Sequence, residues 1–187
     1  MKVIPLHKNQ VLLIKKVKQN NREAQEVLFN QFSSKMLGVC RQYITDRHKS
    51  EELMLNGFLK VFKRLDTFKN KGSFEGWIRR IMINECLSAL RKEDKLVFVE
   101  DAHVFKDVHQ EIQAEDDISD LQILIDKLPN SWRVIFNLFA VEGYKHKEIA
   151  KLLSITEMTS RSRYFKAKKK LQTAYTNLKK TTHGKGH

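Results

Sequence analysis

The sequence predicts an all-α protein, built from two small helical domains joined by an extended acidic linker. Apolar residues recur at helical spacing over most of the 187 residues, and the alternation typical of β-strands is almost absent. Seven glycines and two prolines are too few for the many tight turns of an all-β fold. Residues 1–92 have a net charge of +11, residues 93–120 of −8 and residues 121–187 of +10. Two basic domains and an acidic connection follow from this distribution.

The first domain, residues 1–94, is expected to contain four helices. A short helix covers residues 11–17, and an amphipathic helix over residues 27–43 is broken at Thr45 and Asp46. A third helix covers residues 51–63. After a loop at residues 68–73, Ser73 can cap a fourth helix that extends to residue 92.

The rest of the chain is expected to hold the linker, the second domain and a tail. Residues 95–120 are acidic and lack a sustained period, so they are predicted to be largely extended. Helical patterning returns over residues 121–180, with a short helix near residues 147–153 and a long one from about residue 156 to 178. Residues 181–187 are predicted to be a disordered tail.

The cysteines and the N-terminus indicate an ordinary intracellular protein. Cys40 and Cys86 lie in helical apolar patterns, without a CxxC pair or a Cys/His cluster at zinc spacing. We expect two buried thiols in a reducing cytoplasm, with no metal and no cofactor. No apolar run approaches the roughly 20 residues that span a bilayer, and Pro5 and His7 are unlike a signal peptide. We therefore expect a cytoplasmic protein without stable membrane insertion.

Residues 148–156 carry the strongest motif, a helix followed by a tight turn and the start of a second helix. Ala150 is small where two helices must cross closely, and Ile149 and Leu153 supply a small core. Thr156 can cap the second helix. This pattern predicts a helix-turn-helix whose second helix enters the DNA major groove.

The second helix of this motif has a core stripe and an opposite basic face. At about 100° per residue, Ala167 and Leu171 share the stripe that contains Tyr164. The opposite face combines the groups that contact guanine edges, phosphates and thymine methyls: Arg161, Ser162, Phe165, Lys166 and Lys169. A merely solvated basic face is the alternative, and an exposed Phe165 argues against it.

A second polar surface is expected on the last helix of the first domain. Its side chains follow at steps of four, four and three residues: Arg80, Asn84, Ser88 and Arg91. Asparagine can contact a base edge and arginine a phosphate. Phe68 and Phe74, in or beside the preceding loop, either stack on an unpaired base or belong to the core with Trp77.

Taken together, these segments resemble an extracytoplasmic-function (ECF) sigma factor, of the sigma-70 family. Residues 46–62 are similar to the polymerase-binding helix of sigma region 2, and residues 72–92 to its promoter-opening part. Residues 128–143, with the helix-turn-helix and residues 159–167, are similar to region 4. The order of these segments and the linker between them also match the family.

The resemblance implies a non-enzymatic subunit that binds core RNA polymerase and directs transcription initiation. Contacts to the clamp helices of the largest polymerase subunit would come from Glu52, Leu55, Asn56 and Lys60, and the second domain would meet the flap region. The loop at residues 68–73, with Asn84, would capture a base flipped from the non-template strand of the −10 element. Binding and melting of this element as a whole would involve Phe68, Lys71, Ser73, Arg80, Asn84, Ser88 and Arg91. The basic face of the second domain would recognise the −35 duplex, and the acidic linker would pass through polymerase channels. An anti-sigma factor, which can hold such a protein at the inner membrane, is a further expected partner.

Two other classes of function compete with this interpretation. A stand-alone dimeric helix-turn-helix regulator explains the second domain but leaves Phe68 and Asn84 without a role. A nuclease or similar enzyme would need paired carboxylates, an HExxH motif, a P-loop or a Cys/His nucleophile arrangement. The sequence contains none of these patterns, so no catalytic residue is expected.

Overall fold

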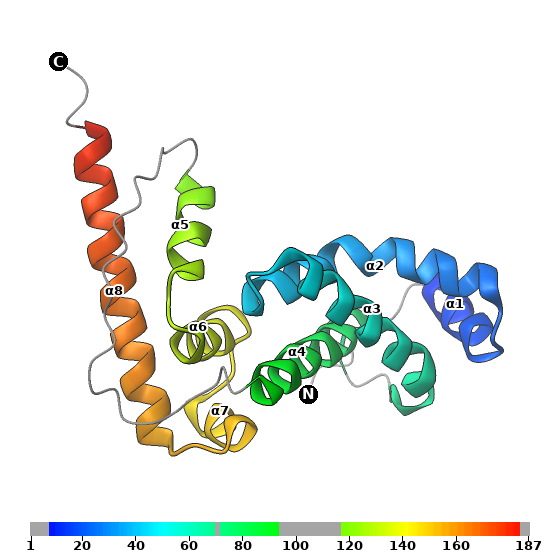
Figure 1. Cartoon of the computed structure of the whole chain (residues 1–187). Coiled ribbons are helices and arrows are strands. Elements are labelled where there is room, and N and C mark those ends of the chain that lie inside the picture. The colour runs from blue at the N-terminus through cyan, green and yellow to red at the C-terminus, as the bar shows by residue number, and fades with distance from the viewer. Residues whose placement is uncertain (1–7, 70–71, 94–116, 184–187) are drawn as a thin grey trace. The chain divides into compact units, whose positions relative to one another are not determined.

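The computed structural model describes residues 8–69, 72–93 and 117–183, and every regular element in these ranges is a helix (Figure 1). The chain divides into two compact units, Met1–Glu93 and Asp94–His187. The predicted all-α class is therefore confirmed. None of the described helices is long and apolar enough to cross a membrane.

The first unit contains α1 (Lys8–Lys18), α2 (Arg22–Tyr43), α3 (Arg47–Arg64), the short 3-10 turn η1 (Leu65–Thr67) and α4 (Phe74–Lys92). A side chain caps the first turn of each of the three long helices. Asn21 Oδ1 accepts a hydrogen bond from the Ala24 N–H at 2.8 Å, and Ser73 Oγ accepts one from the Gly76 N–H at 3.0 Å. The cap predicted at Ser73 is thus confirmed, and it determines where α4 begins.

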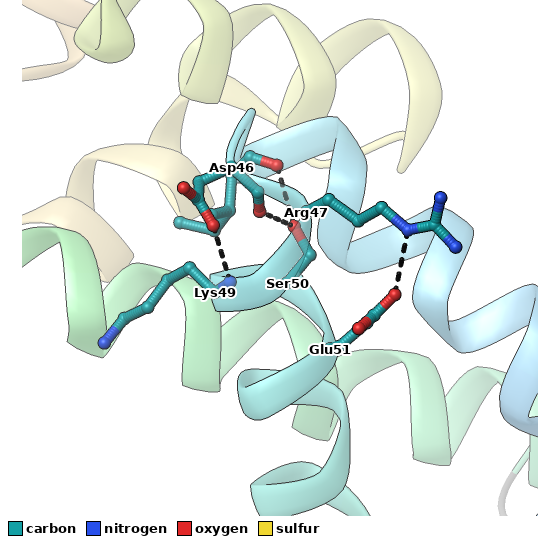
Figure 2. Close-up of polar contacts among 6 residues, drawn as sticks. Asp46, Arg47, Lys49, Ser50 and Glu51 are labelled. Atoms are coloured by element: carbon teal, nitrogen blue, oxygen red, sulfur yellow. Dashed lines mark hydrogen bonds and ion pairs between the residues drawn. The ribbon is translucent and has the colours of Figure 1, made fainter.

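The turn between α2 and α3 is held by polar contacts (Figure 2). The carboxylate of Asp46 accepts a hydrogen bond from the Lys49 N–H at 2.7 Å, which caps α3. The buried Ser50 hydroxyl lies 2.7 Å from the Asp46 carbonyl oxygen and 2.9 Å from that of Ile44. These contacts start α3 at Arg47, earlier than the predicted residue 51.

Helices α2, α3 and α4 pack on one another to form the core of this unit. Each contributes fully buried side chains, for example Met36, Phe58 and Met82. Helices α3 and α4 lie close together at Gly57, where an added Cβ would clash with Sδ of Met82. Because Met82 is itself fully buried, glycine at this position permits the close contact of the two helices.

Both cysteines lie in this core as free thiols, as the sequence predicts. A hydrogen bond with Cys40, together with burial, raises the pKa of the Cys86 thiol above its ordinary value. The thiol therefore stays protonated, which makes it a poor nucleophile and metal ligand.

The second unit contains α5 (Asp117–Asp126), α6 (Asn130–Phe136), the π-helical turn η2 (Asn137–Val141), α7 (His146–Leu153) and α8 (Glu157–His183). The long helix α8 packs against α5, α6 and α7 (Figure 1). One buried cluster joins the first two of these helices to α8, and it consists of Leu124, Ile125, Leu128, Trp132, Ala167 and Leu171.

Two boundaries differ from the sequence prediction. Residues 117–120, assigned to the linker, form the first turn of α5. Residues 181–183, assigned to the tail, continue α8. The remaining linker residues up to 116 and the tail residues 184–187 lie outside the described ranges.

Candidate nucleic-acid interface

Helices α7 and α8 form a helix-turn-helix. Helix α7 ends at Leu153, and its C-cap residue, Ser154, has a left-handed backbone conformation (φ 57°, ψ 44°). The Ile155 N–H donates to the carbonyl oxygen of Ala150 at 3.0 Å, which closes the turn. The Thr156 hydroxyl then accepts a hydrogen bond from the Thr159 N–H at 3.0 Å and caps α8, as the sequence predicts.

Two buried hydrogen bonds hold α8 against its neighbours. The guanidinium of Arg163 donates to the Ser131 hydroxyl on α6 at 2.6 Å. The imidazole of His146, the first residue of α7, lies 2.9 Å from the Ser160 hydroxyl. All four side chains are buried, and sequence reasoning missed both pairs, which join residues 32 and 14 positions apart.

His146 is enclosed by aromatic and charged groups of the second unit. Its ring stacks on Phe139 of η2 at a centroid distance of 4.3 Å and meets the edge of Tyr164 on α8 at 5.7 Å. Burial, and then the positive charge of Arg161, lower the pKa of His146, and Glu157 opposes them with a smaller effect. The structure therefore favours the neutral imidazole at neutral pH.

We expect this lowered pKa to make the second unit less stable in acid. In the unfolded chain His146 takes up a proton near pH 6.5, before the folded unit does. The free energy of unfolding should therefore fall as the pH drops below about 6.5, and the fall should end at the lower pKa of the folded state. Urea unfolding at several pH values, followed by Trp132 fluorescence in a Trp77→Phe background, measures this directly.

The variant His146→Gln should show a weaker pH dependence than its parent in that range. His48→Gln removes an exposed imidazole from the other unit and is the matched control. Equal pH dependence in the parent and in His146→Gln would contradict the expectation.

Helix α8 is exposed on the face opposite Ser160, Arg163 and Tyr164, the residues that contact α6, α7 and η2. All five predicted −35 residues lie on it: Arg161, Ser162, Phe165, Lys166 and Lys169. The Glu157 carboxylate accepts hydrogen bonds from Nη2 of Arg161 at 2.5 Å and from Nε at 3.2 Å, so the guanidinium is already oriented. The ammonium of Lys166 lies 5.9 Å from the centre of the Trp132 ring. Sequence reasoning missed Glu157 and the neighbouring Met158, which is 79% exposed.

The polar stripe on α4 is also brought together as expected, because Arg80, Asn84, Ser88 and Arg91 are all exposed on one helix. The loop before it differs from the prediction. Phe68 is only 8% exposed, and its ring lies 5.1 Å from Phe74 and 5.6 Å from Trp77, centroid to centroid.

Phe68 therefore belongs to the core in this structure, and its assignment as a residue that stacks on an unpaired base is corrected. Three aromatic rings bury more apolar surface together than a lone ring at the surface would. Ser73 is exposed, and its hydroxyl caps α4. Lys71 lies outside the described residues.

The outer face of α3 carries the residues predicted to bind polymerase. Leu55 is 50% exposed, Asn56 is half-buried, and Glu52 and Lys60 are exposed. Glu52 pairs with Lys49 at 3.3 Å, and Lys60 pairs with Glu85 of α4.

A further exposed leucine, Leu59, extends this face. It is 56% exposed and follows Leu55 by one helical turn, so the two leucines form an apolar strip on α3. Their spacing was visible in the sequence, but the sequence could not show that both leucines are exposed in the described part of the first unit.

These features combine a helix-turn-helix, which is a DNA-binding motif, in one unit with a polar, cationic helix face on α4 in the other. Comparison with known proteins places both units in one family. Sigma-70 region 2 matches residues 28–96, and sigma-70 region 4 matches residues 119–171.

Similar proteins align over most of the chain. The RNA polymerase sigma-H factor of Pseudomonas aeruginosa is 27% identical over 87% of this chain and 91% of its own length. The ECF RNA polymerase sigma-E factor of Haemophilus influenzae is 23% identical over 86% of this chain and 92% of its own. Among solved structures, the sigma factor RpoE of Bartonella quintana, in complex with the anti-sigma factor NepR, has the same fold. Its TM-score is 0.51 at 19% identity, covering 80% of this chain and 94% of that one.

The chain belongs to the sigma-70 family of RNA polymerase sigma factors and to its ECF class. It directs transcription initiation as a non-enzymatic factor. Sigma factors bind core RNA polymerase, and the helix-turn-helix of region 4 binds DNA. The match to region 2 decides against a stand-alone helix-turn-helix regulator, because such a regulator has no use for that unit.

Proposed function

We propose that the two units divide promoter recognition between them. Residues 121–180 bind the −35 element as duplex DNA, and residues 1–94 bind core polymerase and the −10 element. The main support for this proposal is the exposed face of α8. This face combines the oriented guanidinium of Arg161 with the exposed hydroxyl of Ser162 and the exposed ring of Phe165. Residues 95–116 connect the helices of the two units, and we assign this linker the path through the polymerase channels.

For the −35 element, Arg161 has the central role. Two of its nitrogens are held by Glu157, which leaves Nη1 and the second hydrogen of Nη2 directed away from the carboxylate. That end of a guanidinium matches the two acceptors of a guanine in the major groove. Lys166 and Lys169 neutralise phosphates beside it, and Ser162 adds a hydrogen-bonding group.

For the −10 element, the stripe on α4 receives the non-template strand. Asn84 is exposed in the middle of this stripe, and Arg80 and Arg91 lie on either side of it along α4. Asparagine can bind two edge atoms of one base, and the arginines bind phosphates. Flipping one base costs a few kcal/mol, and Ser73, Lys71 and Asn84 offset that cost by holding the base. Phe68 supports this loop from inside the core.

Polymerase binding is assigned to the outer face of α3. Leu55 and Leu59 leave an exposed apolar strip, and Glu52, Asn56 and Lys60 supply polar contacts around it. An apolar centre with a polar rim is the usual composition of a protein interface. Its partner is the clamp-helix region of the largest polymerase subunit, and the second unit contacts the flap.

We also assign this chain an anti-sigma factor and a cytoplasmic location. The Bartonella quintana relative is complexed with such a factor. RNA polymerase, which this chain must reach, works in the cytoplasm.

The proposal is tested by run-off transcription with purified core polymerase on fragments of the source genome. The wild-type chain should select discrete start sites. Leu55→Glu combined with Leu59→Glu should abolish both start-site selection and co-purification with core polymerase. Val27→Glu is the matched control, because Val27 is 53% exposed on α2 of the same unit. A chain that dimerises and ignores core polymerase would contradict the proposal.

A separate prediction concerns promoter opening. Asn84→Ala should impair initiation on duplex promoters more than on templates melted beforehand at the −10 element, because base capture stabilises the open strand. Potassium permanganate footprinting and abortive initiation on both templates measure the difference. Asn30→Ala, which replaces an exposed asparagine of α2, is the control. Equal defects on the two templates would exclude a role for Asn84 in opening.

A further inference from the structure

The carboxylate of Glu85 on α4 lies at the crossing of α3 and α4. Its side chain is 12% exposed, and it accepts a hydrogen bond from the ammonium of Lys60 on α3, 25 positions away in the sequence. An added Cβ at Gly57 of α3 would lie 3.8 Å from Cγ of Glu85, so the stem of Glu85 packs against α3. The negative charge of Glu85 is therefore held toward α3.

The same carboxylate adjoins the polar stripe on α4 that is proposed to bind the −10 strand. Glu85 directly follows Asn84 and precedes Ser88 by about one helical turn, and both of these residues belong to the stripe. Glu85 is the single acidic residue of α4 after its first turn. A strand on the stripe brings phosphates close to this carboxylate, and the two like charges repel each other.

We propose that Lys60 is a positioning residue for promoter opening, which acts through Glu85. By donating to the carboxylate, Lys60 neutralises its charge and holds it toward α3, away from the −10 strand. This inference rests on the proposed binding of that strand by α4. An ammonium has three donor hydrogens, so Lys60 keeps two of them for the polymerase contact assigned to it.

An ion pair that merely joins α3 to α4 would give a different pattern of variants. Loss of either partner would then loosen α4, and both single variants would bind the −10 strand more weakly. Neutralisation predicts a loss when Lys60 is removed and a gain when Glu85 is removed, because the second change removes the repulsion itself. The signs of the two effects therefore distinguish a charge effect from a structural one.

The test measures binding of a single-stranded −10 oligonucleotide to holoenzyme. Its sequence is the non-template strand of a promoter mapped by run-off transcription. Excess core polymerase keeps each full-length variant assembled, so a weaker polymerase contact of Lys60 does not enter the measurement. Lys60→Met should weaken strand binding about three- to tenfold at low salt, as expected for one uncompensated charge within about 10 Å. The loss should shrink as the salt concentration rises.

Two further variants assign this effect to Glu85. Glu85→Gln alone should strengthen strand binding about two- to threefold at low salt, because Lys60 then adds a positive charge beside the stripe. In the Lys60→Met background, the same change should restore wild-type affinity. Lys63→Met is the matched control, because it removes an exposed lysine from the same helix and leaves the pair of Lys60 with Glu85 intact. It should bind the strand as wild type does.

The outcomes separate this inference from the proposed function. Strand binding by Glu85→Gln at or below the wild-type affinity overturns the inference, and this result decides the matter even where Lys60→Met fails to fold. Wild-type binding by Lys60→Met, or no recovery in the double variant, overturns it as well. In these cases −10 binding stands if wild-type holoenzyme prefers the −10 strand to a scrambled strand. Absence of that preference rejects the −10 assignment itself, and the role of Lys60 with it.

Discussion

Replacing Phe74 with alanine should lower the free energy of unfolding of the first unit by about 3–5 kcal/mol, the range for large aromatic truncations in a core. Phe74 is 1% exposed at the start of α4, and its ring lies 5.8 Å from both Phe32 and Trp77, centroid to centroid. The loss combines missing apolar burial with a cavity beside the rings of Phe32, Phe68 and Trp77. Because Phe74 begins α4, which carries the proposed −10 stripe, promoter opening should weaken together with stability.

Denaturant unfolding followed by Trp77 fluorescence, in a Trp132→Phe background, measures the change in the first unit alone. Val27→Ala is the control, and as a half-exposed position it should change stability by no more than about 0.5 kcal/mol. A loss below about 1 kcal/mol for Phe74→Ala would mean that the neighbouring rings collapse into the space.

Replacing Arg161 with alanine should weaken binding to the preferred −35 sequence by about 1–3 kcal/mol, the range for one lost bidentate base contact. The fold should be preserved, since Arg161 is exposed and its ion pair with Glu157 is a surface pair of little net stability. Association with core polymerase should be unchanged. Competition binding of holoenzyme to the preferred duplex and to point-substituted duplexes measures the effect.

Two further variants show whether Arg161 contacts a base. Arg161→Lys keeps the charge and loses the planar fork, so it should lose selectivity almost as fully as alanine does. Arg47→Ala removes an exposed arginine paired with Glu51 at 3.0 Å in the first unit (Figure 2), and it should leave −35 selectivity intact. An equal loss on every duplex for Arg161→Ala would assign the side chain to a phosphate instead.

The helices were predictable because each buries one stripe of side chains, and a stripe repeats at the helical period within a single segment. Their ends were predicted less well. Helix α2 begins at Arg22 and not at residue 27, because the cap at Asn21 starts a mainly polar first turn in which Ala24 is the single buried residue. The start of α4 was predicted correctly, since Ser73 stands next to the loop that it ends.

The residues of the candidate site were also predictable from the sequence only in part. The exposed face of α8 and the stripe on α4 each lie on one helix, so angular spacing alone was enough to group their residues. Phe68 could not be assigned from the sequence, because its burial depends on Phe74 and Trp77 folding back over it. The pair of His146 with Ser160 was missed for a related reason, because polar residues that meet across a turn follow no period.

By itself, the sequence determined the helical class, the two basic segments on either side of an acidic one, and the directions in which the side chains of each helix point. These are local properties, set by composition and by the geometry of a single helix. Only the tertiary structure decided which side chains are covered, which includes the burial of Phe68 and the exposure of Met158. Burial is a property of two or more elements in contact, and it therefore exists only once those elements have packed.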